Sequence, residues 1–187
     1  MNIQMIVTDL DSTLLRSDKT ISDYTLRILS LCKKQNIYIA FATARSEDSC
    51  KRFTDLIHPD AIVSNGGALA RIGAKTVYRS MVSKETTNEL LDLCLKHAEV
   101  GYITADTDKG YFVSKPVDES DPGWIDYLPA RIIDFSRGLD CEAYKIIVEA
   151  SDKATIYEIA SQFPSLDMIP FSCESMYRFA DKSADSG

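Results

Sequence analysis

The stretch MIVTDLDSTLL, residues 5–15, decides the fold. Residues 3–8 are mostly apolar and predict a buried strand. The strand then ends at two aspartates, Asp9 and Asp11, which are followed by Ser12 and Thr13. Carboxylates at the end of a buried strand are unfavourable unless a positive charge lies beside them. We therefore ask what positive group meets these two aspartates.

The residues that follow predict alternating helices and strands. Residues 22–35 carry apolar side chains at helical spacing and begin at Ser22 or Asp23, residue types that cap helices. Residues 46–56 predict a second helix, and the short apolar runs at 37–42 and 61–64 predict strands. Strands and helices that alternate with short connections predict a parallel sheet with right-handed crossovers. Residues 68–72 and 76–80 flank a Gly-Ala-Lys turn and predict a hairpin.

The pattern changes in the second half of the chain. We expect helices at residues 83–97 and 154–163, and strands at 100–105, 110–114, 143–148, 166–171 and 175–179. Residues 117–130 have no clear period and predict loop and short helix. This order of elements is typical of an α+β unit. The sequence therefore predicts one unit at residues 1–81 and a second at 82–180.

Composition excludes several kinds of partner. The 187 residues are 45% hydrophobic and 26% charged, and the net charge is −7. This charge argues against nucleic acid or an anionic membrane as the main partner, because both require clustered Lys and Arg. We find neither a signal peptide nor an apolar stretch near the ~18 residues of a membrane helix. The five scattered cysteines predict neither a disulfide framework nor a zinc site and fit the cytoplasm.

Three loops follow the predicted parallel strands. They begin at Asp9, at Thr43 and at Ser64, and the last includes Asn65 and Gly66. Ligands of parallel α/β sheets bind outside the carboxyl ends of the strands, so we expect these loops to meet at one crevice. For each loop a simpler explanation competes. The aspartates could be a polar strand end, Thr43 and Arg45 a helix cap and a surface salt bridge, and the Asn-Gly-Gly run a plain turn.

The residue types in these loops favour phosphoryl chemistry. Paired carboxylates suit Mg²⁺, which prefers oxygen ligands. An aspartate whose charge a metal neutralises can attack phosphorus and form an aspartyl-phosphate. A second aspartate beside it can protonate the leaving oxygen and later activate water. The hydroxyl group of Thr43 can donate to phosphoryl oxygens.

The motifs DLDSTLL, FATARS and VSNGG resemble those of the haloacid dehalogenase superfamily. The order of elements resembles its Cof-type phosphatases (subfamily IIB), over the whole chain. The resemblance implies an α/β fold, in which a Rossmann-like parallel-sheet core carries an α+β cap domain of the C2 type. It also implies the roles of the site residues. Asp9 would be the nucleophile and a Mg²⁺ ligand, and Asp11 the acid/base, with its backbone carbonyl on the metal. Thr13 would brace the turn, Thr43 would bind phosphate, Asn65 and Gly66 would lie near the crevice, and Arg45 would contact substrate.

The sequence departs from the family pattern in two motifs and at its end. Ser12 and Ala44 replace glycines, a change that is tolerable if the backbone there avoids positive φ. The family returns from its cap to a Lys-Gly pair and further metal-binding aspartates. Here residues 181–187 start such a return, with Ser186 at the lysine position and Lys182 ahead of the motif. The resemblance thus implies an incomplete core with weakened metal binding. The strand at 3–8 would become an apolar sheet edge, which predicts self-association.

Three hypotheses for the function follow. The first is a cytoplasmic, Mg²⁺-dependent phosphatase that hydrolyses a small phosphorylated metabolite, such as a sugar phosphate. The second is a truncated, catalytically impaired relative that acts as a binding or assembly module. A third, a phospho-receiver domain, fits residues 82–180 poorly, because that fold has no large inserted unit.

Overall fold

The structure is a computed structural model, and it describes residues 3–118, 125–127, 129–171 and 175–184. Ser186, the position predicted for the family lysine, lies outside these residues. The chain divides into two compact units between Arg79 and Ser80, and the second unit extends to Ala184. The sequence analysis placed this boundary after residue 81. The two units are described separately below.

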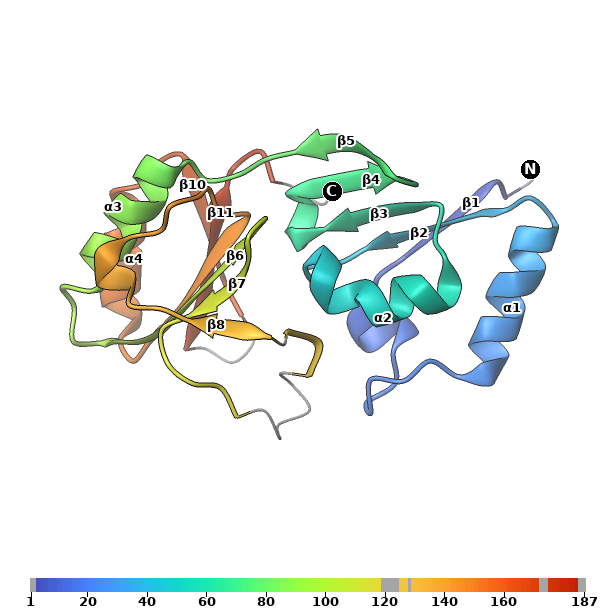
Figure 1. The fold of residues 1–187 in the computed structure, drawn as a ribbon, viewed down its shortest axis with the longest axis horizontal. Coiled ribbons are helices and arrows are strands. Elements are labelled where there is room, and N and C mark those ends of the chain that lie inside the picture. The colour runs from blue at the N-terminus through green and yellow to red at the C-terminus, as the bar shows by residue number, and fades with distance from the viewer. Residues whose placement is uncertain (1–2, 119–124, 128, 172–174, 185–187) are drawn as a thin grey trace. The chain divides into compact units, whose positions relative to one another are not determined.

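The first unit is a five-stranded sheet in the order β1-β2-β3-β4-β5 (Figure 1). Its elements are β1 (Met5–Thr8), α1 (Asp23–Lys34), β2 (Tyr38–Ala42), α2 (Glu47–Ile57), β3 (Ala61–Ser64), β4 (Leu69–Ile72) and β5 (Lys75–Arg79). β1, β2 and β3 are parallel, as the sequence predicts, and β4 and β5 add an antiparallel hairpin. Because the strands progress in one direction, right-handed crossovers put α1 and α2 on the same face of the sheet.

Local sequence explains where these helices begin and which face they bury. The hydroxyl of Ser22 accepts the Thr25 N–H at the start of α1, and that of Ser46 accepts the Ser49 N–H at the start of α2. Apolar side chains from both helices pack on alternate residues of the strands. The buried core of this unit is formed by Leu10, Leu15, Leu29, Ile39, Phe41, Cys50, Phe53, Ile57 and Ile62.

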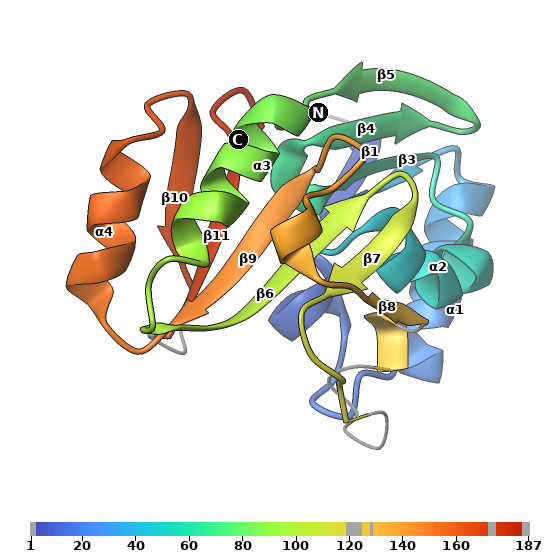
Figure 2. The ribbon, with the colours of Figure 1, turned by 60° about the vertical axis from the view of Figure 1, so that its left-hand side comes forward.

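The second unit is a six-stranded sheet in the order β10-β11-β9-β6-β7-β8. Its strands are β6 (Val100–Thr107), β7 (Gly110–Val113), β8 (Ala130–Ile132), β9 (Lys145–Ala150), β10 (Leu166–Pro170) and β11 (Met176–Asp181). Its helices are α3 (Lys84–Cys94) and α4 (Lys153–Ser161), with 3₁₀ turns at Ile125–Tyr127 and Phe135–Arg137. Figure 2 shows the long strands β6, β9 and β11 side by side. All the pairs are antiparallel except β7–β8.

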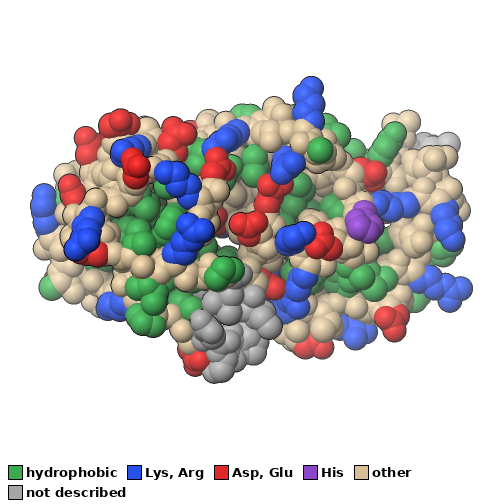
Figure 3. Space-filling view, in the orientation of Figure 1, with side chains coloured by type: hydrophobic (Ala, Val, Ile, Leu, Met, Phe, Trp, Pro, Cys, Tyr) green, Lys and Arg blue, Asp and Glu red, His purple; other side chains and the backbone are tan. Residues whose placement is uncertain are grey.

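A mixed α/β fold with a parallel sheet in one unit and an α+β second unit agrees with the sequence analysis. The strand β8 was not predicted, because Ala130–Ile132 is short and follows a segment without periodicity. The helices of the second unit bury Leu90, Leu91, Ile156 and Ile159 against the sheet. Across the described residues, no helix has both the length and the apolarity that a bilayer crossing demands. On the face seen in Figure 3, Lys and Arg are interspersed with Asp and Glu rather than gathered in one patch.

Gly138 offers a test of packing in the second unit. Its φ is +71°, and a Cβ atom there would lie 2.8 Å from Oδ1 of Asn88. That amide binds both the N–H and the carbonyl of Leu139. We expect Gly138→Ala to lower the free energy of unfolding by about 2–3 kcal/mol, since it adds backbone strain and disturbs these hydrogen bonds. Urea unfolding followed by circular dichroism measures the change.

Gly73 is the matched control. It also has a positive φ, +54°, but an added Cβ would meet nothing within 4 Å. Gly73→Ala should therefore cost only the strain of a left-handed residue, about 1 kcal/mol. Equal losses for the two variants would show that the contact with Asn88 is unimportant.

Candidate active site

The three loops at the carboxyl ends of β1, β2 and β3 meet within the first unit. The Arg45 side chain donates to the carboxylate of Asp11, which joins the second loop to the first. The Asn65 N–H donates to the carbonyl of Arg45 at 2.7 Å, and the Gly66 N–H to that of Thr43 at 3.1 Å. These bonds join the third loop to the second. The convergence that the strand order predicts is therefore present.

Asp11 lies between two cations. Nε of Arg45 is 2.6 Å from Oδ2 of Asp11, and one terminal nitrogen is 3.0 Å from Oδ1, so the pair is bidentate. Nζ of Lys19 lies 2.7 Å from the same Oδ1. Arg45 is only 6% exposed, and it also donates to the carbonyl of Ser49. Arg45, for which the resemblance implied a substrate contact, is thus hydrogen-bonded to Asp11.

These two cations determine the charge of Asp11. The hydrogen bond from Arg45 is the largest cause, and with the contribution of Lys19 it lowers the pKa of Asp11 to about 2, although partial burial acts in the opposite direction. Asp11 is therefore ionised at neutral pH. In this arrangement its carboxylate has no proton to donate, and the two cations also weaken it as a base.

Asp9 differs from Asp11 in its surroundings. It follows β1 in an extended conformation, and its side chain is exposed. Among the described residues, none donates a hydrogen bond to its carboxylate. The two aspartates of the motif are therefore not equivalent, because one is paired within the chain and the other faces outward.

The turn at Leu10–Leu14 contains Ser12 and Thr13. Ser12 has φ +59°, so the backbone adopts the left-handed conformation that glycine favours, and the condition for a tolerable serine is not met. Thr13 is exposed, and its hydroxyl makes no hydrogen bond to the described residues. The turn is closed instead by the backbone, through the Leu15 N–H and the Leu10 carbonyl at 2.8 Å.

The remaining predicted residues are buried around the second loop. The hydroxyl of Thr43 accepts the Arg45 N–H at 3.2 Å and keeps its own proton available for a donor bond. Asn65 is 1% exposed, and its Oδ1 has no hydrogen-bond partner among the described residues. Gly66 has φ +64° and is buried. Asn65 thus offers a buried acceptor beside the loop that follows β2.

Lys19 was not anticipated. Its ammonium reaches Asp11 because a tight turn, in which the Arg16 N–H donates to the Thr20 carbonyl, folds the chain back. Lys19 itself has φ +59°, and Arg52 donates to its carbonyl. A lysine in a polar turn is ordinarily a solvated surface residue. The only sequence signal here was the Ser-Asp-Lys-Thr run, which is typical of a turn.

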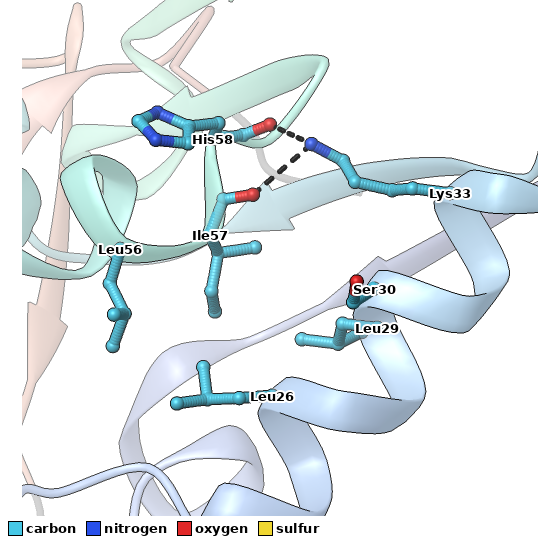
Figure 4. A pocket seen from close by; sticks show the side chains of 7 residues that line it. All are labelled: Leu26, Leu29, Ser30, Lys33, Leu56, Ile57 and His58. Carbon is cyan, nitrogen blue, oxygen red and sulfur yellow. Dashed lines mark hydrogen bonds between the residues drawn. The ribbon is translucent and has the colours of Figure 1, made fainter.

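A groove of about 350 Å³ lies elsewhere in the first unit, between α1 and the end of α2 (Figure 4). Lys33 donates from α1 to the carbonyls of Ile57 and His58, the last residues of α2 and its cap. This is a helix C-cap, in which a cation satisfies terminal carbonyls. The end of α2 leads into the amino end of β3, away from the strand ends that carry the aspartates. We therefore assign this groove a structural role.

Comparison with known proteins agrees with this geometry. Residues 6–180 match the family model of the haloacid dehalogenase-like hydrolases, and the chain belongs to this family. Two curated relatives, from Buchnera aphidicola and Mycoplasma genitalium, are each 26% identical, over 98 and 192 residues. Both are named "Putative phosphatase". The matches include 51% and 97% of this chain but only 37% and 66% of those proteins.

Solved structures share the fold. A haloacid dehalogenase-like hydrolase from Bacteroides thetaiotaomicron aligns with a TM-score of 0.82 at 16% identity, over 99% of this chain and 73% of that one. A sugar phosphatase of subclass IIB aligns with a TM-score of 0.78 at 16% identity, over 98% of this chain and 72% of that one. At these identities the likeness concerns the fold alone.

The backbone at Ser12 leads to a prediction. A left-handed conformation costs a non-glycine residue about 1–2 kcal/mol, and glycine removes this strain but gives the unfolded chain more conformational entropy. We therefore expect Ser12→Gly to raise the free energy of unfolding by a net amount of up to about 1 kcal/mol. Ser30→Gly, at an exposed position inside α1, should have the opposite sign, because glycine weakens helices. A destabilised Ser12→Gly protein would contradict the strain argument. Thermal unfolding of the wild type and the two variants measures both changes in stability.

The paired state of Asp11 predicts a dependence of stability on pH. Its folded-state pKa, about 2, lies below the ordinary value of 3.8. The stabilisation is therefore complete above pH about 3.8 and disappears as pH falls through about 2. The difference in unfolding free energy between wild type and Asp11→Asn should shrink over this interval. Urea titrations at graded pH test this, and Asp55→Asn, which removes an exposed carboxylate on α2, is the control. If the difference in unfolding free energy did not change with pH, the pairing of Asp11 with Arg45 and Lys19 would be refuted.

Proposed function

We propose that this protein is a phosphatase that hydrolyses phosphate monoesters of small metabolites, with Asp9 as the nucleophile and Mg²⁺ as the cofactor. The observation that carries the proposal is the different state of the two aspartates in one family motif. Asp9 is exposed and open to a ligand, whereas Asp11 is fixed beside it by Arg45. Membership of the hydrolase family supports the reaction class. The fold of a sugar phosphatase favours sugar phosphates among the substrates.

The donor set fits Mg²⁺ with few protein ligands. The described residues contain no cluster of three or more His, Cys, Asp or Glu side chains that could hold a metal. Mg²⁺ nevertheless needs only one or two carboxylates when it keeps waters and binds substrate phosphate. The Asp9 carboxylate and the backbone carbonyl of Asp11 would hold it, since the Asp11 side chain is engaged by cations. When bound, the ion would reduce the repulsion between Asp9 and the phosphate.

The chain's own residues would act in two steps. In the first, an Asp9 oxygen attacks phosphorus, the ester P–O bond breaks, and the leaving oxygen takes a proton from the protonated form of Asp11. In the second, water attacks the phosphorus of the aspartyl-phosphate, Asp11 accepts the proton, and the bond to Asp9 breaks to release phosphate. The ionised state of Asp11 suits the second step. Thr43 would donate its hydroxyl proton to a phosphoryl oxygen, and Asn65 would accept a donor from the substrate.

A second candidate is a catalytically weak relative that serves as a binding or assembly module. The double pairing of Asp11 favours it, because Arg45 and Lys19 oppose the protonated form that the first step requires. The lack of an acidic cluster in the described part of the chain also favours weak metal binding. The two candidates differ in the rate at which the protein should hydrolyse a phosphate monoester.

Hydrolysis of p-nitrophenyl phosphate separates them. We expect Mg²⁺-dependent release of p-nitrophenol, and a loss of about a thousand-fold or more in Asp9→Asn, because the nucleophile is removed. Asp55→Asn, a matched aspartate variant on the exposed face of α2, should keep wild-type activity. If wild type and Asp9→Asn are equally inactive, the phosphatase proposal fails and the module remains.

A further inference from the structure

The turn that follows the aspartate motif holds the backbone of Lys19 firmly. The Lys19 N–H donates to the Arg16 carbonyl and the Arg16 N–H to the Thr20 carbonyl, each at 2.9 Å. The N–H and the hydroxyl of Thr20 both donate to the carboxylate of Asp18. From α2, a guanidinium nitrogen of Arg52 donates to the carbonyl of Lys19 at 3.2 Å. These hydrogen bonds fix the point from which the Lys19 side chain extends.

Lys19 has a backbone conformation that suits glycine better. Its φ of +59° lies in the left-handed region, where a side chain adds strain and glycine adds none. Strain of this kind is concentrated at functional sites, where the surrounding contacts maintain it. Among the described residues, the ammonium group of Lys19 has one polar contact, the ion pair with Asp11. The strained conformation thus belongs to a residue whose charge reaches the candidate active site.

The two cations on Asp11 differ in how firmly they are held. Arg45 is buried, contacts both carboxylate oxygens and also donates to the Ser49 carbonyl. Lys19 contacts only Oδ1 of Asp11, and it is partly exposed. A single ion pair that is partly exposed contributes little free energy, so the ammonium group can leave it easily. Arg45 is therefore the fixed partner of Asp11, and Lys19 is the one that can exchange.

A phosphoryl group on Asp9 would lie within reach of Lys19. Only Leu10 separates the two aspartates, so their Cα atoms are at most ~7 Å apart. Leu10 is fully buried, whereas Asp9 is exposed and Asp11 is partly exposed. A lysine carries a compact ammonium group on a flexible four-carbon stem and binds phosphate as a point charge. At equal distance, a phosphate dianion attracts this group about twice as strongly as the single charge of Asp11 does.

We propose that Lys19 is a phosphate-binding residue of the candidate active site. Without ligand, its ammonium group pairs with Asp11, as in the structure. When a phosphate monoester or inorganic phosphate binds at Asp9, the ammonium group moves to a phosphoryl oxygen, and Asp11 keeps its hydrogen bonds to Arg45. No covalent bond changes in this exchange. The inference rests on the proposed function, because that function makes a phosphoryl group the ligand.

Isothermal titration calorimetry with inorganic phosphate, in the presence of Mg²⁺, tests the proposal without turnover. We expect Lys19→Met to raise the dissociation constant of phosphate at least about ten-fold, because a charge-assisted hydrogen bond is lost. Lys19→Gly removes the same ammonium group but suits the left-handed turn, so it should lose as much affinity even if Lys19→Met fails to fold. Lys51→Met is the matched control, since Lys51 pairs with Asp55 on the exposed side of α2. It should bind phosphate like wild type.

The Asp11→Asn background separates a direct contact from an effect through Asp11. If Lys19 itself binds phosphate, Lys19→Met should lower the affinity in Asp11→Asn at least as much as in wild type, because no carboxylate then competes for the ammonium group. If the loss disappears in Asp11→Asn, Lys19 acts only by holding Asp11, and the proposal is wrong.

Two further results would overturn the proposal: unchanged phosphate affinity in both Lys19 variants, or a wild type that binds no phosphate. Hydrolysis of p-nitrophenyl phosphate keeps this inference distinct from the proposed function. An active wild type whose Lys19→Met variant keeps both its phosphate affinity and its KM would refute the role of Lys19 alone. Phosphate binding that depends on Lys19, in a protein that hydrolyses no ester, would refute the phosphatase alone.

Discussion

The buried guanidinium of Arg45 requires an anion, and Asp11 supplies it. A cation that is 6% exposed loses most of its hydration, and removing the partner of such a charge typically costs about 3–5 kcal/mol. The same pair joins the loop after β1 to the loop after β2, while the Arg45 carbonyl receives the amide of Asn65 from the loop after β3. One residue thus connects all three strand ends, and the geometry of the site depends on it.

This dependence gives Asp11 two functions that cannot be changed separately. As the acid/base of the proposed reaction it must exchange a proton, but as the partner of Arg45 it must remain charged to keep the loops together. Lys19 strengthens the charged state from the other side, at the end of a turn in which Lys19 itself is left-handed. Ser12, also left-handed, adds strain one residue after Asp11. Two unfavourable backbone conformations therefore flank one firmly held carboxylate.

Much of this fold follows from local sequence. Apolar runs of four to six residues gave the strands, and side-chain oxygens at Ser22, Ser46, Ser83 and Asp152 mark where helices begin. The meeting of the three loops followed from strand order alone. The partners inside the site did not, because the contact between Lys19 and Asp11 depends on how a turn folds back. The left-handed Ser12 was not predicted for a related reason, since serine does not signal positive φ as glycine does.

Charge distinguishes the two aspartates of the motif. The protein is acidic overall, yet the end of β1 meets two cations from its own chain, and both lie on Asp11. Internal neutralisation of Asp11 leaves Asp9 as the carboxylate whose charge must be balanced from outside. A dianionic phosphate would approach such a carboxylate only if a cation accompanied it. The pairing of Asp11 within the chain and the proposed requirement of Asp9 for a divalent ion therefore follow from one charge distribution.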